Sequence, residues 1–318
     1  MRNVLVLSLL ALPLLSWAAA DLGAEAKAQA IALAQPRVRS QYDALKKEAD
    51  LIKDPVRRKE LADLLDRPVF RVLERRKKDE AAIVAALKSA GLLDASVQSF
   101  FPPVPAMAFV AAPAGVWGGH HSYPGGLVDH TLFNLRAGLA LAAVYRRNYG
   151  LTIDDDAIRI AALMHDMGKT ETLRWNADGS VAASEPQIAG TGLHHILAVT
   201  EAIERGWPPA LVVCVAAAHS PPHPGSDLDK LLGFLKAAAI ISGASNAAAG
   251  LTPDGKALAA TAPLEAFITH LDDHDYILTE TSIRAADASM RARGISDNWK
   301  RDEFLSERSD LALYGLQP

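Results

Sequence analysis

The chain has 318 residues, half of them hydrophobic, and a formal net charge of −4 with histidine neutral. This length permits a sizeable core and one or two domains. The lack of a basic excess excludes a protein that wraps nucleic acid through bulk charge. Alanine and leucine are abundant, whereas aromatic residues make up only 6% of the chain. Because Ala and Leu favour helices, and β-branched and aromatic residues favour strands, the composition predicts an all-α protein.

Residues 1–20 have the pattern of a secretory signal peptide. Arg2 supplies a positive charge, an apolar stretch runs from Val4 to Leu15, and three alanines precede Asp21. Such an order is typical of a cleaved signal, and the stretch is shorter than the roughly 20 residues of a membrane span. We therefore expect an exported protein in a bacterial periplasm, without a stable membrane span after cleavage; the alternative is an N-terminal membrane anchor. With Cys214 as its single cysteine, the chain can form no internal disulfide.

The region from 21 to 92 is expected to be helical. Its first part, 24–50, is rich in Ala, Lys, Glu and Gln and is interrupted by Pro36. A second helix is expected over 57–65, after a proline that the first turn of a helix tolerates. Apolar residues at helical spacing continue over 69–87, and a glycine then provides a stop signal.

The stretch from 94 to 124 differs in composition from the region before it, since it contains many prolines and glycines. It predicts a long irregular connection, and connections of this length are often functional. The connection carries two adjacent histidines, His120 and His121, among its glycines. Helices are then expected at about 127–149, 156–165, 192–205, 208–219, 227–245, 263–272 and 275–292, with a turn between two short strands near 175–180. These changes in composition and pattern along the chain predict a signal peptide at 1–20, a helical region at 21–92, a functional domain at 93–250 and a C-terminal helical region at 251–318.

Histidines are concentrated in the centre of the chain, and eight of the ten lie between residues 120 and 223. Four of them fall on successive predicted helices at intervals of 35, 30 and 24 residues: His130, His165, His195 and His219. Helices packed antiparallel around one core can bring such positions to one level. Asp166 directly follows one of these histidines, and two adjacent buried ionisable groups are costly without a compensating charge. Imidazole and carboxylate both bind divalent transition metals, so the pattern predicts a metal site.

Two motifs in this region, Gly125–Thr131 and His165–Lys169, together resemble the HD-domain superfamily of metal-dependent phosphohydrolases. The longer string His121–Leu127, with His195-Ile196 and His219-Ser220, resembles the branch that contains HD-type 3′–5′ exoribonucleases. The resemblance covers about residues 115–245. It implies an all-α, HD-domain-like helical bundle, here with additional N- and C-terminal helices.

The resemblance also implies roles for particular residues. His130, His165 and Asp166 match the first family ligands, and Asp166 would bridge two metal ions. His195 and His219 match the histidines that hold the second ion, so we expect two divalent transition-metal ions, of Mn, Fe, Ni, Co or Zn. Lys169 matches a lysine that contacts the substrate phosphate.

The chain departs from the family pattern at one ligand. The family completes its set with an aspartate on a later helix, and Ser242 stands at the position where we expect that residue. A serine is a poor, neutral ligand, so the predicted activity depends on another carboxylate. The candidates are Asp287, in a family-like local context, and the C-terminal aspartates Asp272, Asp273 and Asp275.

The expected activity is phosphohydrolase cleavage of a phosphomonoester or phosphodiester by a metal-activated water. Asp166, Lys169 and His121 are the predicted catalytic residues, with His121 or His120 protonating the leaving oxygen. The expected partner is a small phosphorylated substrate or a short oligonucleotide, and the sequence does not define the oligomeric state. Two alternatives remain: a catalytically degenerate HD-fold binding module, as Ser242 suggests, and an HD-type di-iron oxygenase.

Overall fold

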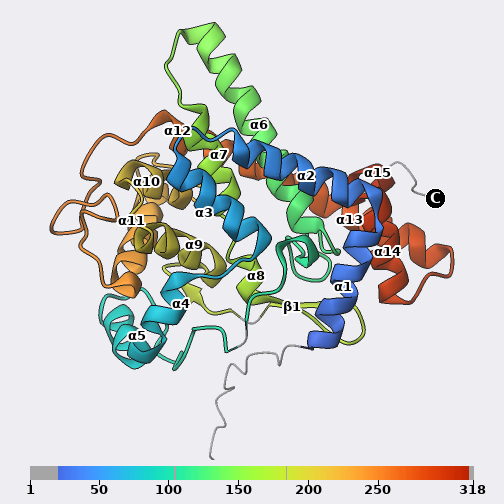
Figure 1. Cartoon of the computed structure of the whole chain (residues 1–318). Helices are drawn as coiled ribbons and strands as arrows, with labels where there is room; N and C mark the ends of the chain where they lie inside the picture. Colours follow the sequence, from blue (N-terminus) through green and yellow to red (C-terminus); the bar gives the residue numbers. More distant parts are fainter. Residues whose placement is uncertain (1–20, 104, 184, 315–318) are drawn as a thin grey trace, which may run out of the picture.

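A computed structural model describes residues 21–103, 105–183 and 185–314 of the protein, and these residues are mostly helical (Figure 1). Strands in the described part form two short antiparallel hairpins, β1 (Leu173–Trp175) with β2 (Val181–Ala183), and β3 (Gln187–Ile188) with β4 (Thr191–Gly192). The prediction of an all-α fold is therefore confirmed. The predicted signal peptide at 1–20 lies outside the described residues.

The N-terminal region forms α1 (Leu22–Ala34), α2 (Pro36–Asp50), α3 (Pro55–Asp66), α4 (Arg71–Arg76), a 3-10 turn η1 (Lys77–Asp79) and α5 (Glu80–Ser89). Pro36 and Pro55 each occupy the first position of their helices, where the missing N–H of proline has no hydrogen bond to lose. Asp54 caps α3 because its carboxylate accepts hydrogen bonds from backbone N–H groups of the first turn. The helical stretch expected over 69–87 is divided by the turn η1.

The central helices follow a long irregular connection that contains only the 3-10 turn η2 (Phe109–Ala111) among its described residues. They are α6 (Gly126–Tyr149), α7 (Asp155–Met164), α8 (Lys169–Thr172), α9 (Leu193–Glu204), α10 (Pro209–Ala217) and α11 (Ser226–Ser242). Asp154 caps α7, and Gly243 ends α11 with a φ of 70°, a conformation that glycine adopts without strain. The predicted bounds of these helices agree with the structure to within a few residues.

The C-terminal region forms α12 (Leu264–Asp272), the 3-10 turn η3 (Asp273–Asp275), α13 (Tyr276–Ala292), α14 (Asn298–Arg308) and α15 (Asp310–Tyr314). In Figure 1 these helices, drawn in orange and red, return to the blue helices α1 and α2. Arg37 of α2 fixes this contact by donating to the backbone carbonyl of Ser306. The C-terminal region therefore closes against the start of the described chain.

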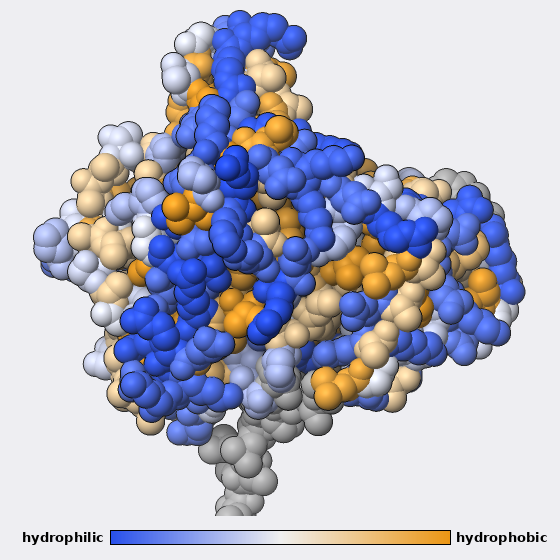
Figure 2. All heavy atoms as spheres, in the orientation of Figure 1, coloured by the Kyte–Doolittle hydropathy of each residue, from blue (hydrophilic) through white to orange (hydrophobic). Residues whose placement is uncertain are grey.

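One apolar core runs through all three expected segments beyond residue 20. It includes Leu45 from the N-terminal region, Leu163 from the centre and Trp299 from the C-terminal region. Figure 2 shows that the surface over α2 and α3 is mostly hydrophilic, as expected for helices that bury one face. Among the described helices, α6 alone is long and apolar enough for a membrane span, and half of that stretch is buried inside the protein.

Candidate metal centre

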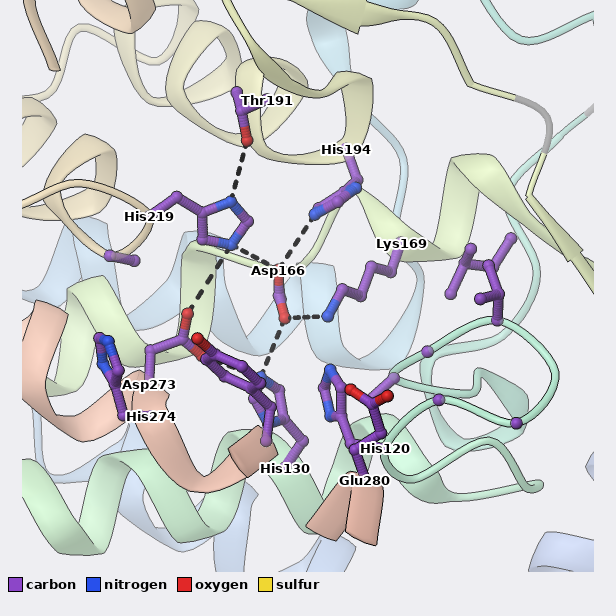
Figure 3. A pocket seen from close by; sticks show the side chains of 18 of the residues that line it. His120, His130, Asp166, Lys169, Thr191, His194, His219, Asp273, His274 and Glu280 are labelled. Atoms are coloured by element: carbon purple, nitrogen blue, oxygen red, sulfur yellow. Dashed lines mark hydrogen bonds and ion pairs between the residues drawn. The ribbon is translucent and has the colours of Figure 1, made fainter. Parts of the chain in front are cut away.

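Histidines and aspartates from five elements converge at one place in the bundle (Figure 3). His130 lies in the first turns of α6, and His165 caps the C-terminus of α7. The next elements contribute His194 in the first turn of α9, His219 after α10, and Asp273 at the start of η3. Asp166, which follows His165, occupies the middle of this group.

The first half of the cluster lies around one oxygen of each aspartate. His130 Nε2 is 3.0 Å from Asp166 Oδ2 and 3.1 Å from Asp273 Oδ1. His165 Nε2 is 3.5 Å and 3.3 Å from the same two oxygens. Two imidazoles and two carboxylates thus point inward at distances that a bound cation between them can bridge, and these four residues can hold a metal ion.

The second half lies around the other oxygen of Asp166. His194 Nε2 is 3.6 Å from Asp166 Oδ1, and His219 Nε2 is 3.5 Å from it. These three residues form a second group that can hold an ion. Asp166 therefore turns one carboxylate oxygen to each group, which is the arrangement that a bridging carboxylate requires.

Each of the four inward histidines has an outer partner at its other ring nitrogen. Nδ1 of His130 lies 3.2 Å from Asp275 Oδ1, and Nδ1 of His165 lies 2.9 Å from the backbone carbonyl of Ala162. Such partners fix the ring so that Nε2 faces the aspartates; Nε2 of His130 also lies 3.2 Å from Nδ2 of Asn134. This is the outer arrangement that metal-binding histidines commonly have.

The two histidines of the second group also have outer partners at Nδ1. Nδ1 of His194 lies 2.8 Å from Glu185 Oε1, and Nδ1 of His219 lies 3.1 Å from the hydroxyl of Thr191. Both partners come from the hairpin segment that precedes α9. This segment therefore orients two histidines at once.

The cluster carries negative charge that protons balance when no cation is bound. Burial by itself would lower the pKa of His165, but the charges of Asp166 and Asp273 outweigh it and raise the pKa to about 10. Burial likewise opposes the shift of His130, but contacts with Asp166, Asp273 and Asp275 raise its pKa well above its ordinary value. A divalent cation can take the place of these protons, since a metal binds the neutral ring.

Close backbone packing positions the ends of these helices. A Cβ atom on Gly168 would lie 2.1 Å from the backbone oxygen of His194, so only glycine allows α9 to begin here. A Cβ on Gly126 would lie 1.9 Å from the backbone oxygen of His121. The glycines of both sequence motifs thus bring backbone segments together around the cluster.

One of the five sequence-predicted ligands, His195, lies outside the two groups around Asp166, and its neighbour His194 takes part instead. His195 was expected among the ligands, but its Nε2 lies 3.3 Å from the carbonyl of Val215 and its ring stacks on His219. It is completely buried and takes no part in either ligand group, whereas His194 does. The helical register of α9 decides between these adjacent histidines, and the sequence alone gave no signal for that choice.

The further carboxylate of the candidate site comes from outside the segment 93–250. Ser242 donates its hydroxyl to the carbonyl of Ala238 in its own helix and lies outside both ligand groups. Asp287 pairs with Arg301 at 2.7 Å and is likewise outside them. Of the C-terminal candidates, Asp273 enters the cluster directly, and Asp275 supports His130 from behind.

A cavity of about 700 Å³ opens above the cluster. Lys169 lines it, with its Nζ 2.5 Å from Asp166 Oδ2, and His120 lines it from the glycine-rich connection. His121 lies outside this cavity, where its backbone N–H donates to Asp310. Of the three residues predicted to be catalytic, Asp166 and Lys169 line the cavity, whereas His121 does not line it and forms a further group that can hold an ion with His120 and His130.

Comparison with known proteins gives one similarity of consequence. A dihydroneopterin 2′,3′-cyclic phosphate phosphodiesterase from Methanocaldococcus jannaschii is 28% identical to the chain over 192 residues. The match covers 58% of this chain and 60% of that relative, so the chain spans less than two thirds of its length. No family model and no solved structure matches the chain. The similarity supports phosphoester hydrolysis as the general chemistry.

Proposed function

We propose that this protein is a metal-dependent phosphoesterase of the HD type that acts on a phosphodiester. The observation that carries the proposal is the common orientation of four histidines, His130, His165, His194 and His219. Their outer nitrogens are engaged, and their inner nitrogens surround two aspartates below a cavity. Two divalent transition-metal ions held there would supply charge neutralisation and an activated water.

The residues around the cavity have distinct tasks in this proposal. Lys169 places a positive charge beside Asp166, where it would contact a non-bridging phosphate oxygen. Burial holds the pKa of His120 well below its ordinary value, so this ring is neutral at pH 7. His120 would therefore orient the substrate through hydrogen bonds and not carry a proton to the leaving oxygen, in contrast to the sequence-based expectation.

The name of the relative favours cyclic phosphodiesters as the first substrates to test. We propose that a 2′,3′-cyclic phosphate is accepted by this chain, with its phosphate between Lys169 and the ligand groups. The cavity has room for such a compound, since small-molecule sites commonly span about 300–1,000 Å³.

The test combines metal analysis with hydrolysis by the purified full chain. We expect about two transition-metal equivalents per chain, and hydrolysis of bis(p-nitrophenyl) phosphate and of a nucleoside 2′,3′-cyclic phosphate. Asp166→Asn should lower kcat at least about 1,000-fold, because it removes the central charge of the site. Asp287→Asn is the matched control and should keep both metal and activity. A metal-free wild-type protein, or unchanged turnover in Asp166→Asn, would exclude the proposal.

A further inference from the structure

A second cavity of about 480 Å³ shares His270 with the cavity above the metal centre and is lined mostly by apolar side chains. We propose that it holds the apolar group, an alkyl chain or an uncharged ring, of the phosphoester whose phosphate lies over the metal centre. This inference rests on the proposed function and adds a substrate class to it: amphiphilic phosphoesters. The cavity is formed by α12, the C-terminal half of α6, and the segments that follow α6 and α10.

One face of α12 gives this cavity an apolar wall. Leu264, Phe267 and Leu271 recur at the spacing of one helix face, and they are 40%, 37% and 48% exposed. Ile153 and Ile268 are buried in a small separate core cluster and form its floor. Large apolar side chains gathered around a hollow in this way mark a binding site more often than isolated exposed ones do.

The apolar wall is directly connected to the ligand set through α12. His270 lines both cavities, and its Nδ1 lies 2.8 Å from the carbonyl of Ala218, the residue before the ligand His219. Leu271 is two residues from Asp273, so their Cα atoms are at most about 7.6 Å apart. In this proposal the apolar group reaches the second cavity past His270, the described residue that lines both cavities.

The charge around the second cavity favours an uncharged group over a further phosphate. None of the described residues that line it is Lys or Arg. Its one carboxylate among the described residues is that of Asp227, which lies 3.7 Å from Nδ1 of His223. An oligonucleotide would place its next phosphate here without a cation to meet it, so an alkyl or uncharged ring fits better.

The experiment uses a series of alkyl p-nitrophenyl phosphodiesters, from methyl to octyl, with the full metal-loaded chain. We expect kcat/KM to rise by about two- to fourfold per methylene until the cavity is filled, as burial of each CH₂ allows. The double variant Leu264→Ser/Phe267→Ser should flatten this dependence. Leu51→Ser, at an exposed leucine of the N-terminal region, is the matched control and should keep the full dependence.

Binding gives a second readout that does not depend on turnover. In calorimetry, the Asp166→Asn variant should bind octyl phosphate more tightly than it binds methyl phosphate. Adding Leu264→Ser and Phe267→Ser to this variant should remove the difference between the two ligands. Hydrolysis of the methyl ester without any effect of chain length would overturn this inference and leave the proposed function intact. No hydrolysis of any ester would reject both. Loss of a wild-type dimer in the double variant, seen by sedimentation, would identify the cavity as an interface between copies and also overturn the inference.

Discussion

Two clusters of charged side chains in this protein both combine aspartates with basic groups, but the basic groups differ. The first is the candidate metal centre, and the second lies around Arg301 on α14. Arg301 donates to Asp287 at 2.7 Å, to Asp302 at 2.9 Å and to the carbonyl of Ser122 at 2.6 Å. Its guanidinium lies between the two aspartates, and Asp302 Oδ2 has no hydrogen-bond partner among the described residues.

The aspartates of the candidate metal centre have other neighbours than those around Arg301. Asp166 and Asp273 face four imidazoles, and Lys169 is the ammonium group in contact with Asp166. Neither oxygen of Asp166 accepts a hydrogen bond of good geometry, although ring nitrogens lie near both. The comparison shows that the two clusters differ in the groups their aspartates face: a guanidinium in the Arg301 cluster, and mostly imidazole nitrogens in the candidate metal centre. The number of charged residues does not distinguish them.

The largest expected effect concerns the structural cluster. Arg301→Met should lower the free energy of unfolding by about 3–5 kcal/mol, because it removes the buried guanidinium that Asp287, Asp302 and the carbonyl of Ser122 share. Metal content of the folded protein should stay unchanged. Urea denaturation and metal analysis of the same preparation test both statements. Loss of metal without loss of stability would show that the two clusters are not separate.

The second prediction concerns the carboxylate that completes the metal centre. Asp273→Asn should weaken metal binding at least about 100-fold, since even residues that only support a ligand commonly contribute 10- to 100-fold. Ser242→Asp should bring no gain, because the hydroxyl of Ser242 faces its own helix. Competition with a chelating dye measures both affinities. Tighter binding in Ser242→Asp would restore the sequence-based alignment.

The third prediction separates two adjacent histidines. His194→Ala should weaken metal binding about 10- to 100-fold or more, because one ligand of the second group is lost. His195→Phe keeps a ring stacked on His219 and should leave metal binding within about threefold of wild type, since His195 lies outside both groups. Equal effects of the two substitutions would contradict the register of α9.

The smallest expected effect is a pH dependence of stability. Asp302 shares one guanidinium with Asp287, and burial raises the pKa of Asp302 to about 8. In the unfolded chain this carboxyl ionises near its ordinary value, so between about pH 4 and 8 the folded state holds a proton that the unfolded state has lost. Stability should therefore fall as pH rises through this range, by a few kcal/mol at most. Asp302→Asn should flatten that slope in denaturation curves measured from pH 4 to 9, and an unchanged slope would assign it to other groups.

The sequence alone determined the helical class, the central helices and the concentration of ligand residues. Local signals sufficed for this. Asp154 caps α7 and Gly243 ends α11 through interactions within a few residues. The pair His165-Asp166 stood out because two adjacent ionisable groups end an apolar helix.

Only the tertiary structure decided which atoms meet. The choice of His194 over His195 depends on the rotation of α9 against its neighbours, and adjacent residues on a helix differ by about 100° around its axis. Asp273 joins the cluster from a segment more than 50 residues beyond His219, because α12 and η3 pack against α6. Periodicity and spacing carry no information about such packing, so the final carboxylate of the site became visible only in three dimensions.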